Sequence, residues 1–268
     1  MTKIKRILIY IFLIISSIVS IFPFAWMIIG ATNKSVDVTK GKLTLGSSLM
    51  TNIRTLFETT NIETAIINSL IIAVLTTLLA ILISSLAGYG FEIYRNKSRD
   101  KLSSILLLSM MIPFASIMIP LYRMFGQMKL LNTYVAVIIP SIATAFLIFF
   151  FRQNTKLFPK ELLEAGRVDG LSEFQLFFKI YFPTMSSTYA AAGFITFMSV
   201  WNSYLWPLVV MQTKEKVTLP LIISSLSSSY TPDYGVIMVA IVIATIPTTL
   251  IFFLMQKRFV QGMLGSVK

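Results

Sequence analysis

Six stretches without a charged residue run through the sequence, and each is long enough to cross a lipid bilayer. A helical crossing needs about 20 predominantly apolar residues. The stretches are Ile7–Asn33, Thr64–Phe91, Leu102–Tyr122, Leu130–Phe151, Ile180–Thr213 and Tyr234–Gln256. Because the bilayer core offers no water to backbone N–H and C=O groups, only helices and closed barrels can span it. The pattern predicts an all-α, polytopic membrane protein with six transmembrane helices, in a single transmembrane domain over residues 1–268.

Within these stretches we expect the spans at about residues 7–31, 65–91, 102–122, 130–151, 184–212 and 235–256. The first stretch follows three basic residues, which is also typical of a secretory signal peptide. Its apolar core is longer than that of a signal peptide, and no small-x-small cleavage site follows it. We therefore expect a retained membrane helix there.

The distribution of basic residues predicts the orientation. Of the 23 Lys and Arg residues, 15 lie in the N-terminus, the second and fourth connections and the C-terminus. Cytoplasmic loops carry an excess of Lys and Arg. Both termini and the connection over residues 152–183 are therefore expected in the cytoplasm (N-in/C-in), with extracytoplasmic loops at 32–64 and 213–234. The net charge of +12 is explained by this orientation, so no nucleic-acid partner is expected.

Several kinds of chemistry are excluded by composition. The chain has no cysteine and no histidine, which excludes disulfides, thiolate nucleophiles and imidazole catalysis, and we expect no metal site. Only 13% of its residues are charged, against about 25% in soluble domains. We predict no catalytic residues, and hence a protein that is not an enzyme.

The connection with the most charged residues, nine within residues 152–183, separates the fourth and fifth spans. Pro159 suits the first helical position, where its missing N–H has no partner to lose. Gly170 is placed to end that helix in a left-handed conformation. Ser172 and Gln175 form a capping-box pattern that starts a second helix, and Pro183 is expected to end it. The segment is predicted to be a cytoplasmic helix-turn-helix.

The fifth stretch carries the run Trp201-Asn202-Ser203-Tyr204-Leu205-Trp206-Pro207. Aromatic faces beside amide and hydroxyl groups suit a sugar, whose C–H faces stack while its hydroxyls form hydrogen bonds. Trp and Tyr also gather at membrane–water interfaces, and the two tryptophans fit that interpretation as well. Asn202 and Tyr204 are our candidates for lining a substrate path.

The serine-rich segment between Lys214 and Asp233 is too short and too rich in hydroxyl groups to span the membrane. An extracytoplasmic loop or half-buried helix that touches a solute-delivering partner is one interpretation. An inert connector is the other.

The spacing within residues 164–183 resembles the EAA loop of ABC importer permeases. That loop reads Glu-Ala-Ala, three residues, Gly, nine residues, Ile-x-Leu-Pro. The matching positions in this chain are Glu164, Ala165, Gly166, Gly170, Ile180, Phe182 and Pro183. Gly166 replaces the second alanine and Phe182 replaces the leucine, and both keep the size or apolar class.

Three further pieces resemble the carbohydrate class of these permeases, and the maltose-type six-span partner most of all. They are Trp201–Leu208, the Val217-Thr218-Leu219-Pro220 segment and the tail Lys257–Met263. The likeness implies a subunit that forms half of the translocation pathway of an ATP-driven importer of disaccharides or oligosaccharides. It would lie as a multi-pass protein in the plasma or inner membrane of a prokaryote.

The resemblance also implies partners. They are a second, homologous permease in a heterodimer, two cytoplasmic ABC ATPases and an extracytoplasmic sugar-binding protein. ATP and Mg²⁺ would bind to the ATPases, and this chain would bind no cofactor. ATPase coupling would fall on Glu164, Ala165, Gly166, Asp169, Gly170 and Pro183. In that family, Glu164 would meet the ATPase cleft, and the tail would give Gln261–Met263 a contact as well.

Other functions fit the residues less well. An ion- or proton-coupled carrier normally needs acids or histidines at membrane depth, and none of the 11 Asp and Glu residues lies within the six stretches. A sodium site of carbonyl and hydroxyl groups stays open. An intramembrane enzyme lacks a nucleophile–base pair, and a membrane scaffold would leave the 164–183 spacing unexplained. The chain has no Gly-x4-Gly-Lys-Ser/Thr motif, so ATP hydrolysis must occur elsewhere.

Overall fold

The computed structural model describes the backbone of residues 3–265 and the side chains of residues 3–256. Every regular element in this part of the chain is a helix. The chain divides into two compact units. Unit 1 contains Met1–Ala65 and Leu219–Pro247, and unit 2 contains Ile66–Thr218 and Thr248–Lys268. The expectation of an all-α protein is confirmed for the described residues.

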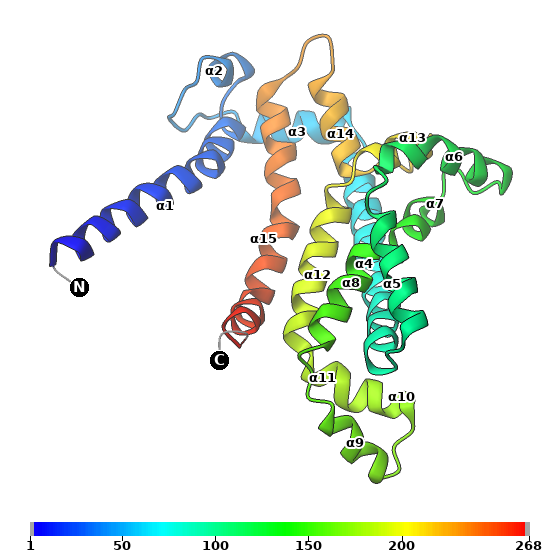
Figure 1. Cartoon of the computed structure of the whole chain (residues 1–268). Helices are drawn as coiled ribbons and strands as arrows, with labels where there is room; N and C mark the ends of the chain where they lie inside the picture. The colour runs from blue at the N-terminus through cyan, green and yellow to red at the C-terminus, as the bar shows by residue number, and fades with distance from the viewer. Residues whose placement is uncertain (1–2, 266–268) are drawn as a thin grey trace. The chain divides into compact units, whose positions relative to one another are not determined.

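Unit 1 is built from long apolar helices and the short helices that join them (Figure 1). Its helices are α1 (Lys3–Ala31), α2 (Ser35–Thr39), α3 (Leu49–Thr59), α14 (Leu219–Ser227) and the first half of α15 (Tyr234–Gly265). Two buried asparagines hold its connections. The Asn52 side-chain amide donates to the carbonyls of Ala31 and Asn33 at 2.9 and 2.8 Å, and Asn33 donates to Thr44 at 2.8 Å. These bonds fix the loop after α1, whose own apolar stretch has no residue buried within the chain.

Unit 2 holds the remaining helices, except that residues 62–65 of the first of them belong to unit 1. They are α4 (Ile62–Ile93), α5 (Lys97–Ser109), α6 (Phe114–Gln127), α7 (Tyr134–Ile138), the 3₁₀-helix η1 (Ile139–Ser141), α8 (Ala145–Thr155), α9 (Glu161–Val168), α10 (Glu173–Gln175), the π-helix η2 (Leu176–Tyr181), α11 (Phe182–Thr184), α12 (Ser186–Trp201), α13 (Leu205–Val210) and the end of α15. Helices α4, α8 and α12 pack side by side around small and apolar residues, with Ala80, Leu147, Phe151 and Ala192 at their centre. Small residues allow such close packing in membranes.

Among the residues that the structure describes, three helices are long and apolar enough to cross a membrane: α1, α4 and the Tyr234–Gln256 part of α15. Two more crossings result if α5 with α6, bent by 96°, and the Tyr134–Ser141 segment with α8, bent by 41°, each count as one. The bend before α6 lies at Pro113, because the residue before a proline avoids the helical conformation. The fifth expected span is divided between α12 and α13 at Asn202–Tyr204. Three to five crossings are therefore supported by helix length, and six remains a prediction.

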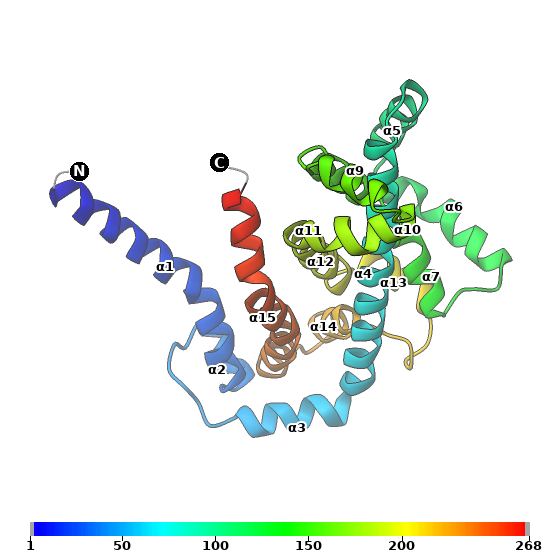
Figure 2. The same ribbon diagram turned by 90° about the horizontal axis from the view of Figure 1, so that it is seen from below.

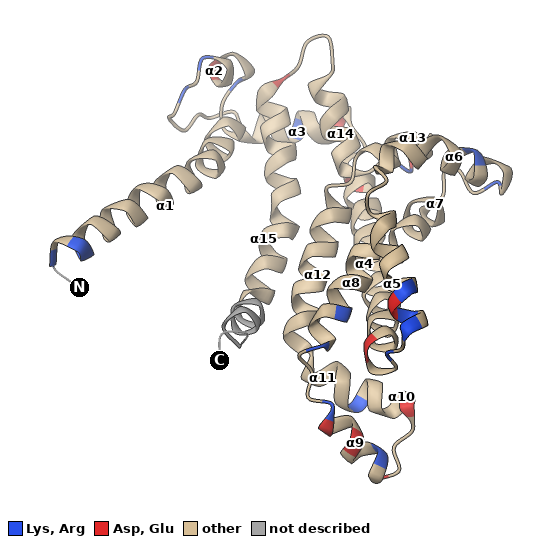
Figure 3. Cartoon of the chain, viewed as in Figure 1, with Lys and Arg blue, Asp and Glu red and all other residues tan. Residues whose placement is uncertain are grey.

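Charged residues of unit 2 gather away from the middle of its long helices. Figure 3 shows them on α9, on α10 and at the start of α5 at one end, and near α6 at the other. The central turns of α4, α8 and α12 carry none in this view. Figure 1 places α9, α10 and α11 at the first of these ends, and Figure 2 shows the chain from that side. An uncharged middle flanked by charged ends is what a membrane-spanning bundle requires.

Candidate functional site

The polar segment 152–183 folds as two short helices joined by a tight turn. Helix α9 begins at Glu161, two residues after Pro159, so the expected start at Pro159 is slightly early. Leu163 and Gly166 are buried on one side of α9. Glu164, Ala165 and Asp169 are exposed on the other. The exposed side of α9 is therefore charged and contains one small residue, Ala165.

Gly170 ends α9 as predicted. Its φ angle is +78°, in the left-handed region that glycine adopts at little cost. The Leu171 N–H donates to the Gly166 carbonyl at 2.9 Å, and the Gly170 N–H donates to the Arg167 carbonyl at 3.1 Å. This pair of bonds is a Schellman motif, which satisfies the last carbonyls of the helix.

The second helix begins at the predicted capping box. The Ser172 hydroxyl accepts from the Gln175 N–H at 3.4 Å, and the Gln175 side chain accepts from the Ser172 N–H at 2.9 Å. These two reciprocal hydrogen bonds satisfy backbone N–H groups that would otherwise have no partner at the start of a helix. Gly170 and Ser172 thus set the angle between α9 and α10 from sequence-local interactions alone.

Pro183 does not end the second helix, contrary to our expectation. It lies inside α11, directly after the π-helix η2. A proline lacks the N–H of an α-helical bond, and its ring collides with the carbonyl four residues earlier. The widened turn over Leu176–Tyr181 makes room for the ring, so the helix continues to Thr184, and α12 begins two residues later at Ser186.

An apolar cluster holds this segment against the end of α4. Its buried members are Tyr89, Phe158, Leu163, Leu176, Phe177, Tyr181 and Met185. The Tyr89 ring of α4 lies edge-on to Phe177 and Tyr181, with centroid distances of 5.3 and 4.8 Å. The Tyr181 hydroxyl also bonds to Thr155 of α8 at 2.6 Å. The segment is therefore packed onto unit 2 and does not hang freely from it.

Gly166 takes part in this packing. A Cβ atom at Gly166 would lie 2.6 Å from Leu176 Cδ2 and 2.7 Å from Ile180 Cδ1. The family resemblance implies an ATPase-coupling role for both Ala165 and Gly166. The packing of Gly166 faces the same chain, whereas Ala165 lies on the exposed side.

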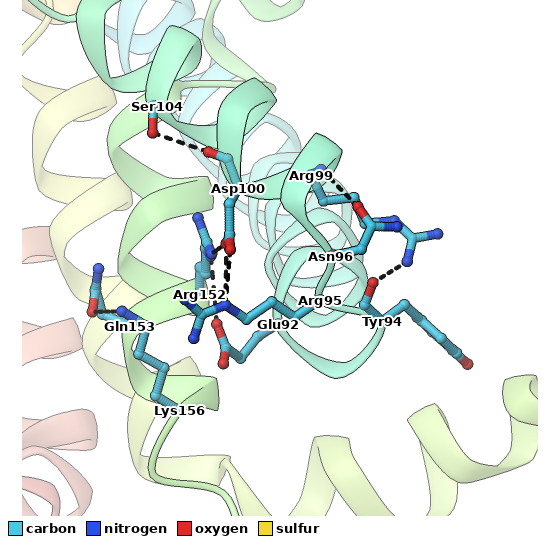
Figure 4. Close-up of polar contacts among 10 residues, drawn as sticks. All are labelled: Glu92, Tyr94, Arg95, Asn96, Arg99, Asp100, Ser104, Arg152, Gln153 and Lys156. Atoms are coloured by element: carbon cyan, nitrogen blue, oxygen red, sulfur yellow. Dashed lines mark hydrogen bonds and ion pairs between the residues drawn. The ribbon is translucent and has the colours of Figure 1, made fainter.

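A second set of contacts, charged and polar, joins the segment to the turn between α4 and α5. Arg152 at the end of α8 lies between Glu92 and Asp100, as Figure 4 shows. Farther along, Glu173 accepts from Arg167 Nε at 2.9 Å and contacts the Tyr94 hydroxyl. The hydrogen bond from Arg167, then that from Tyr94, lowers the pKa of Glu173 below its ordinary value. The same ion pair raises the pKa of Arg167.

These contacts were not predicted from the sequence, although the sequence contains a signal for one of them. Glu92 follows directly after the second uncharged stretch, and Arg152 follows directly after the fourth. In a six-span chain those two stretches end on the same side of the membrane. Opposite charges at such positions can meet, and here Arg152 Nε lies 3.5 Å from Glu92 Oε2.

Asn202 and Tyr204 lie at the break between α12 and α13, beside a cavity of about 440 Å³. Its walls are Phe114, Ser141, Asn202, Ser203, Tyr204, Leu205 and Trp206. A second cavity of about 270 Å³ shares Ser141 and Ser203. Both tryptophans are buried: Trp206 donates to the Ala136 carbonyl at 2.8 Å, and Trp201 stacks on Phe197. They support the break from inside the chain, so neither forms part of an exposed aromatic belt.

Comparison of the sequence with known protein families identifies the family of this chain. Residues 80–265 match the model of the family described as "Binding-protein-dependent transport system inner membrane component". This range includes the helix-turn-helix segment and both cavities. The chain belongs to that family.

Named relatives match this permease over nearly its whole length. It is 51% identical over 259 residues to the "Lactose transport system permease protein LacG" of Rhizobium radiobacter, covering 97% of this chain and 95% of the relative. It is 34% identical over 272 residues to the "Arabinooligosaccharides transport system permease protein AraQ" of Bacillus subtilis (strain 168), covering 99% and 97%. Because these are permease subunits of transport systems, this permease is a transport subunit and not an enzyme.

The fold of this permease is also found in a solved structure. A chain in the "Crystal structure of a bacterial ABC transporter involved in the import of the acidic polysaccharide alginate" superposes with a TM-score of 0.83 and 20% sequence identity. The superposition covers 96% of this permease and 97% of that chain. The tail positions Gln261–Met263 that we expected to contact an ATPase lie outside the residues whose side chains the structure describes.

Proposed function

We propose that this permease is half of the translocation pathway of an ATP-driven importer of disaccharides or oligosaccharides. Its family supplies the transport role, and the names of its relatives, with 51% identity to a lactose permease, support a sugar as the cargo. The observation that carries the proposal is the helix-turn-helix of residues 161–175. It combines an exposed charged face on α9 with a turn fixed by Gly170 and the capping box.

Coupling would use this segment. An ABC ATPase would dock on the exposed side of α9, where Glu164, Ala165 and Asp169 lie. Gly170 and Pro183 would act indirectly, by shaping the turn and the widened helix behind it. ATP and Mg²⁺ would bind to the ATPases, and the permease itself would hold no cofactor.

The sugar would pass the break between α12 and α13. Asn202 and Tyr204 line the larger cavity together with the hydroxyl groups of Ser141 and Ser203. Carbohydrates need hydrogen-bond partners for their hydroxyls and flat apolar surface for their C–H faces. Amide, hydroxyl and aromatic groups converge here, which supports a role in the path.

The assembly would contain a second, homologous permease as the heterodimeric partner, two ATPases and an extracytoplasmic sugar-binding protein. We place it in the plasma or inner membrane of a prokaryote, with six crossings and both termini in the cytoplasm. Six crossings result if α1, α4 and α15 span singly and if α5–α6, α7–α8 and α12–α13 each count as one broken span.

The test is uptake by the purified assembly in proteoliposomes, with radiolabelled lactose and arabino-oligosaccharides as cargo. We expect uptake with ATP, the binding protein and no ion gradient. Uptake that requires a proton or sodium gradient and ignores ATP would overturn the proposal.

A matched pair of glycine variants tests the docking segment in the same assay. Neither Gly170 nor Gly90 has an atom within 4 Å of an added Cβ, but only Gly170 has a positive φ. A strained backbone of this kind costs about 1–3 kcal/mol. We expect Gly170→Val to insert normally and lose uptake, and Gly90→Val to retain it. Normal uptake by Gly170→Val at normal membrane levels would remove the segment from the coupling mechanism.

A further inference from the structure

The turn between α4 and α5 touches the coupling segment twice, once where the segment leaves α8 and once close to its tip. The turn and its flanks comprise residues 92–100, and the coupling segment comprises residues 152–183. These contacts are separate from the exposed face of α9 that would meet an ATPase. All of them lie within unit 2.

The first contact begins with close helix packing. A Cβ at Gly88 would lie 2.7 Å from Phe151 Cβ and 2.8 Å from the Arg152 nitrogen, so α4 and α8 touch backbone to backbone. Glu92 lies four residues farther along α4, on the same face. This geometry places Glu92 Oε2 3.5 Å from Arg152 Nε, with side chains only 4% and 10% exposed.

The Arg152–Glu92 pair is not optimised for stability. Within the described part of the chain, neither Arg152 Nε nor Glu92 Oε2 has a hydrogen-bond partner, and the cost of burying an incompletely bonded ion pair can exceed its attraction. Arg152 also contacts Asp100 of α5, whose carboxylate accepts from Arg95 Nε at 3.0 Å. Arg152 therefore joins α8 to two helices at once (Figure 4).

The second contact lies near the tip. Glu173 of α10 accepts from Arg167 of α9 at 2.9 Å and from the Tyr94 hydroxyl. The Arg99 guanidinium in turn donates to the Tyr94 carbonyl. Tyr94 therefore holds α9 and α10 to the α4–α5 turn through a single carboxylate. Between the two contacts, the Tyr89 ring packs on Phe177 and Tyr181.

We propose that the α4–α5 turn is a bracket that receives the movement of the coupling segment and passes it to α4 and α5. The proposal rests on the proposed function, because it assumes that an ATPase moves the segment. One contact alone would let the segment pivot about it. Contacts at the root and near the tip remove that freedom, so that α4 and α5 follow the segment. Glu92, Tyr94, Arg152 and Glu173 are then positioning residues for coupling.

The test measures how many ATP molecules the full assembly hydrolyses per sugar molecule transported in proteoliposomes. The variants are Tyr94→Phe, Glu173→Gln, Arg152→Gln and the double variant Glu92→Gln with Arg152→Gln. The double variant removes both buried charges together, and so it keeps the test valid if Arg152→Gln alone fails to fold. Arg54→Gln is the control, because it breaks an exposed ion pair with Glu58 in unit 1.

We expect the ATP-to-sugar ratio to rise about tenfold in the double variant, which corresponds to ~1.4 kcal/mol of lost coupling. The Tyr94→Phe and Glu173→Gln variants should raise the ATP-to-sugar ratio only about twofold, because exposed pairs contribute little free energy. The control should match the wild type. Unchanged ratios in all bracket variants, with normal ATP-driven uptake by the wild type, would overturn the bracket alone. Uptake by the wild type without ATP would overturn the proposed function and the bracket with it.

Discussion

At Gly166, a methyl group would meet Leu176 Cδ2 at 2.6 Å and Ile180 Cδ1 at 2.7 Å. The EAA motif that the chain resembles has alanine at this position. The difference is explained by the two large side chains that η2 sends toward α9, since they fill the space that an alanine would occupy. Gly166 and Leu176 are therefore expected to depend on each other.

We predict that Gly166→Ala lowers the stability of the purified assembly by about 1 kcal/mol, the lower end of the usual cost of overpacking, because the ends of the Leu176 and Ile180 side chains can shift. Adding Leu176→Val should recover part of the loss, because the shorter side chain frees the space. Thermal unfolding followed by tryptophan fluorescence measures both effects. Gly90→Ala, with open space around its Cβ, serves as control, and equal melting temperatures for all three would contradict the packing role.

Residue-level prediction from sequence succeeded where an interaction is local in the chain. The positive φ of Gly170 and the bonds between Ser172 and Gln175 follow from residues within a few positions of each other. The burial of Gly166 could not be predicted, because it depends on how α9 folds back onto η2. The pair of Glu92 and Arg152 is 60 positions apart in the sequence, and only the packing of α4 on α8 brings it together.

At the scale of the elements, α4 and α8 touch through their backbones, and Gly88 makes this contact possible. Unlike Gly166, whose neighbours are ends of flexible side chains, Gly88 faces Phe151 Cβ and backbone atoms of Phe151 and Arg152. Backbone atoms cannot move away from an added methyl group as the flexible end of a side chain can. The two helices would have to separate to admit even one methyl group.

We therefore expect Gly88→Ala to destabilise the assembly more than Gly166→Ala does, at or above about 3 kcal/mol. The same change should raise the ATP-to-sugar ratio, because separation of α4 from α8 pulls Glu92 away from Arg152. Gly90→Ala, two residues along the same helix, is the matched control. A Gly88→Ala variant as stable as this control would mean that α4 and α8 are not in contact in the assembly.

The uncharged stretches of the sequence predicted where helices lie, but they did not predict where those helices are interrupted. The second and sixth stretches correspond to the long helices α4 and α15, whereas the third, fourth and fifth are interrupted. The interruptions lie at or near Pro113, Pro140 and Pro207. A prediction from hydropathy depends only on how apolar the residues are. It takes no account of the N–H that proline lacks, so it treats two helices separated near a proline as one span.

For the whole molecule, the orientation in the membrane is open to a direct test, since the sequence contains no cysteine. Single cysteines can be introduced without removing any other. Asp169 lies exposed beside the Gly170 turn, and Tyr230 is fully exposed in the predicted extracytoplasmic loop. Both changes leave buried side chains untouched.

We predict that a membrane-impermeant maleimide labels Tyr230→Cys in intact cells and labels Asp169→Cys only after the membrane is opened. Excess positive charge in the connections around Gly170 is the physical reason. Wild-type protein gives the background. Labelling of Asp169→Cys from outside would reverse the orientation and exclude docking of a cytoplasmic ATPase on α9.

The widened turn over Leu176–Tyr181 has a consequence for how chain length can vary in this segment. A π-turn closes over five residues instead of four, so it holds one residue more than regular α-helix would. Loss of one residue there would return the turn to α geometry and leave the helix on either side in phase. Elsewhere in the segment, the same deletion would rotate every following side chain by about 100°. Insertions and deletions that preserve docking should therefore concentrate just before Pro183.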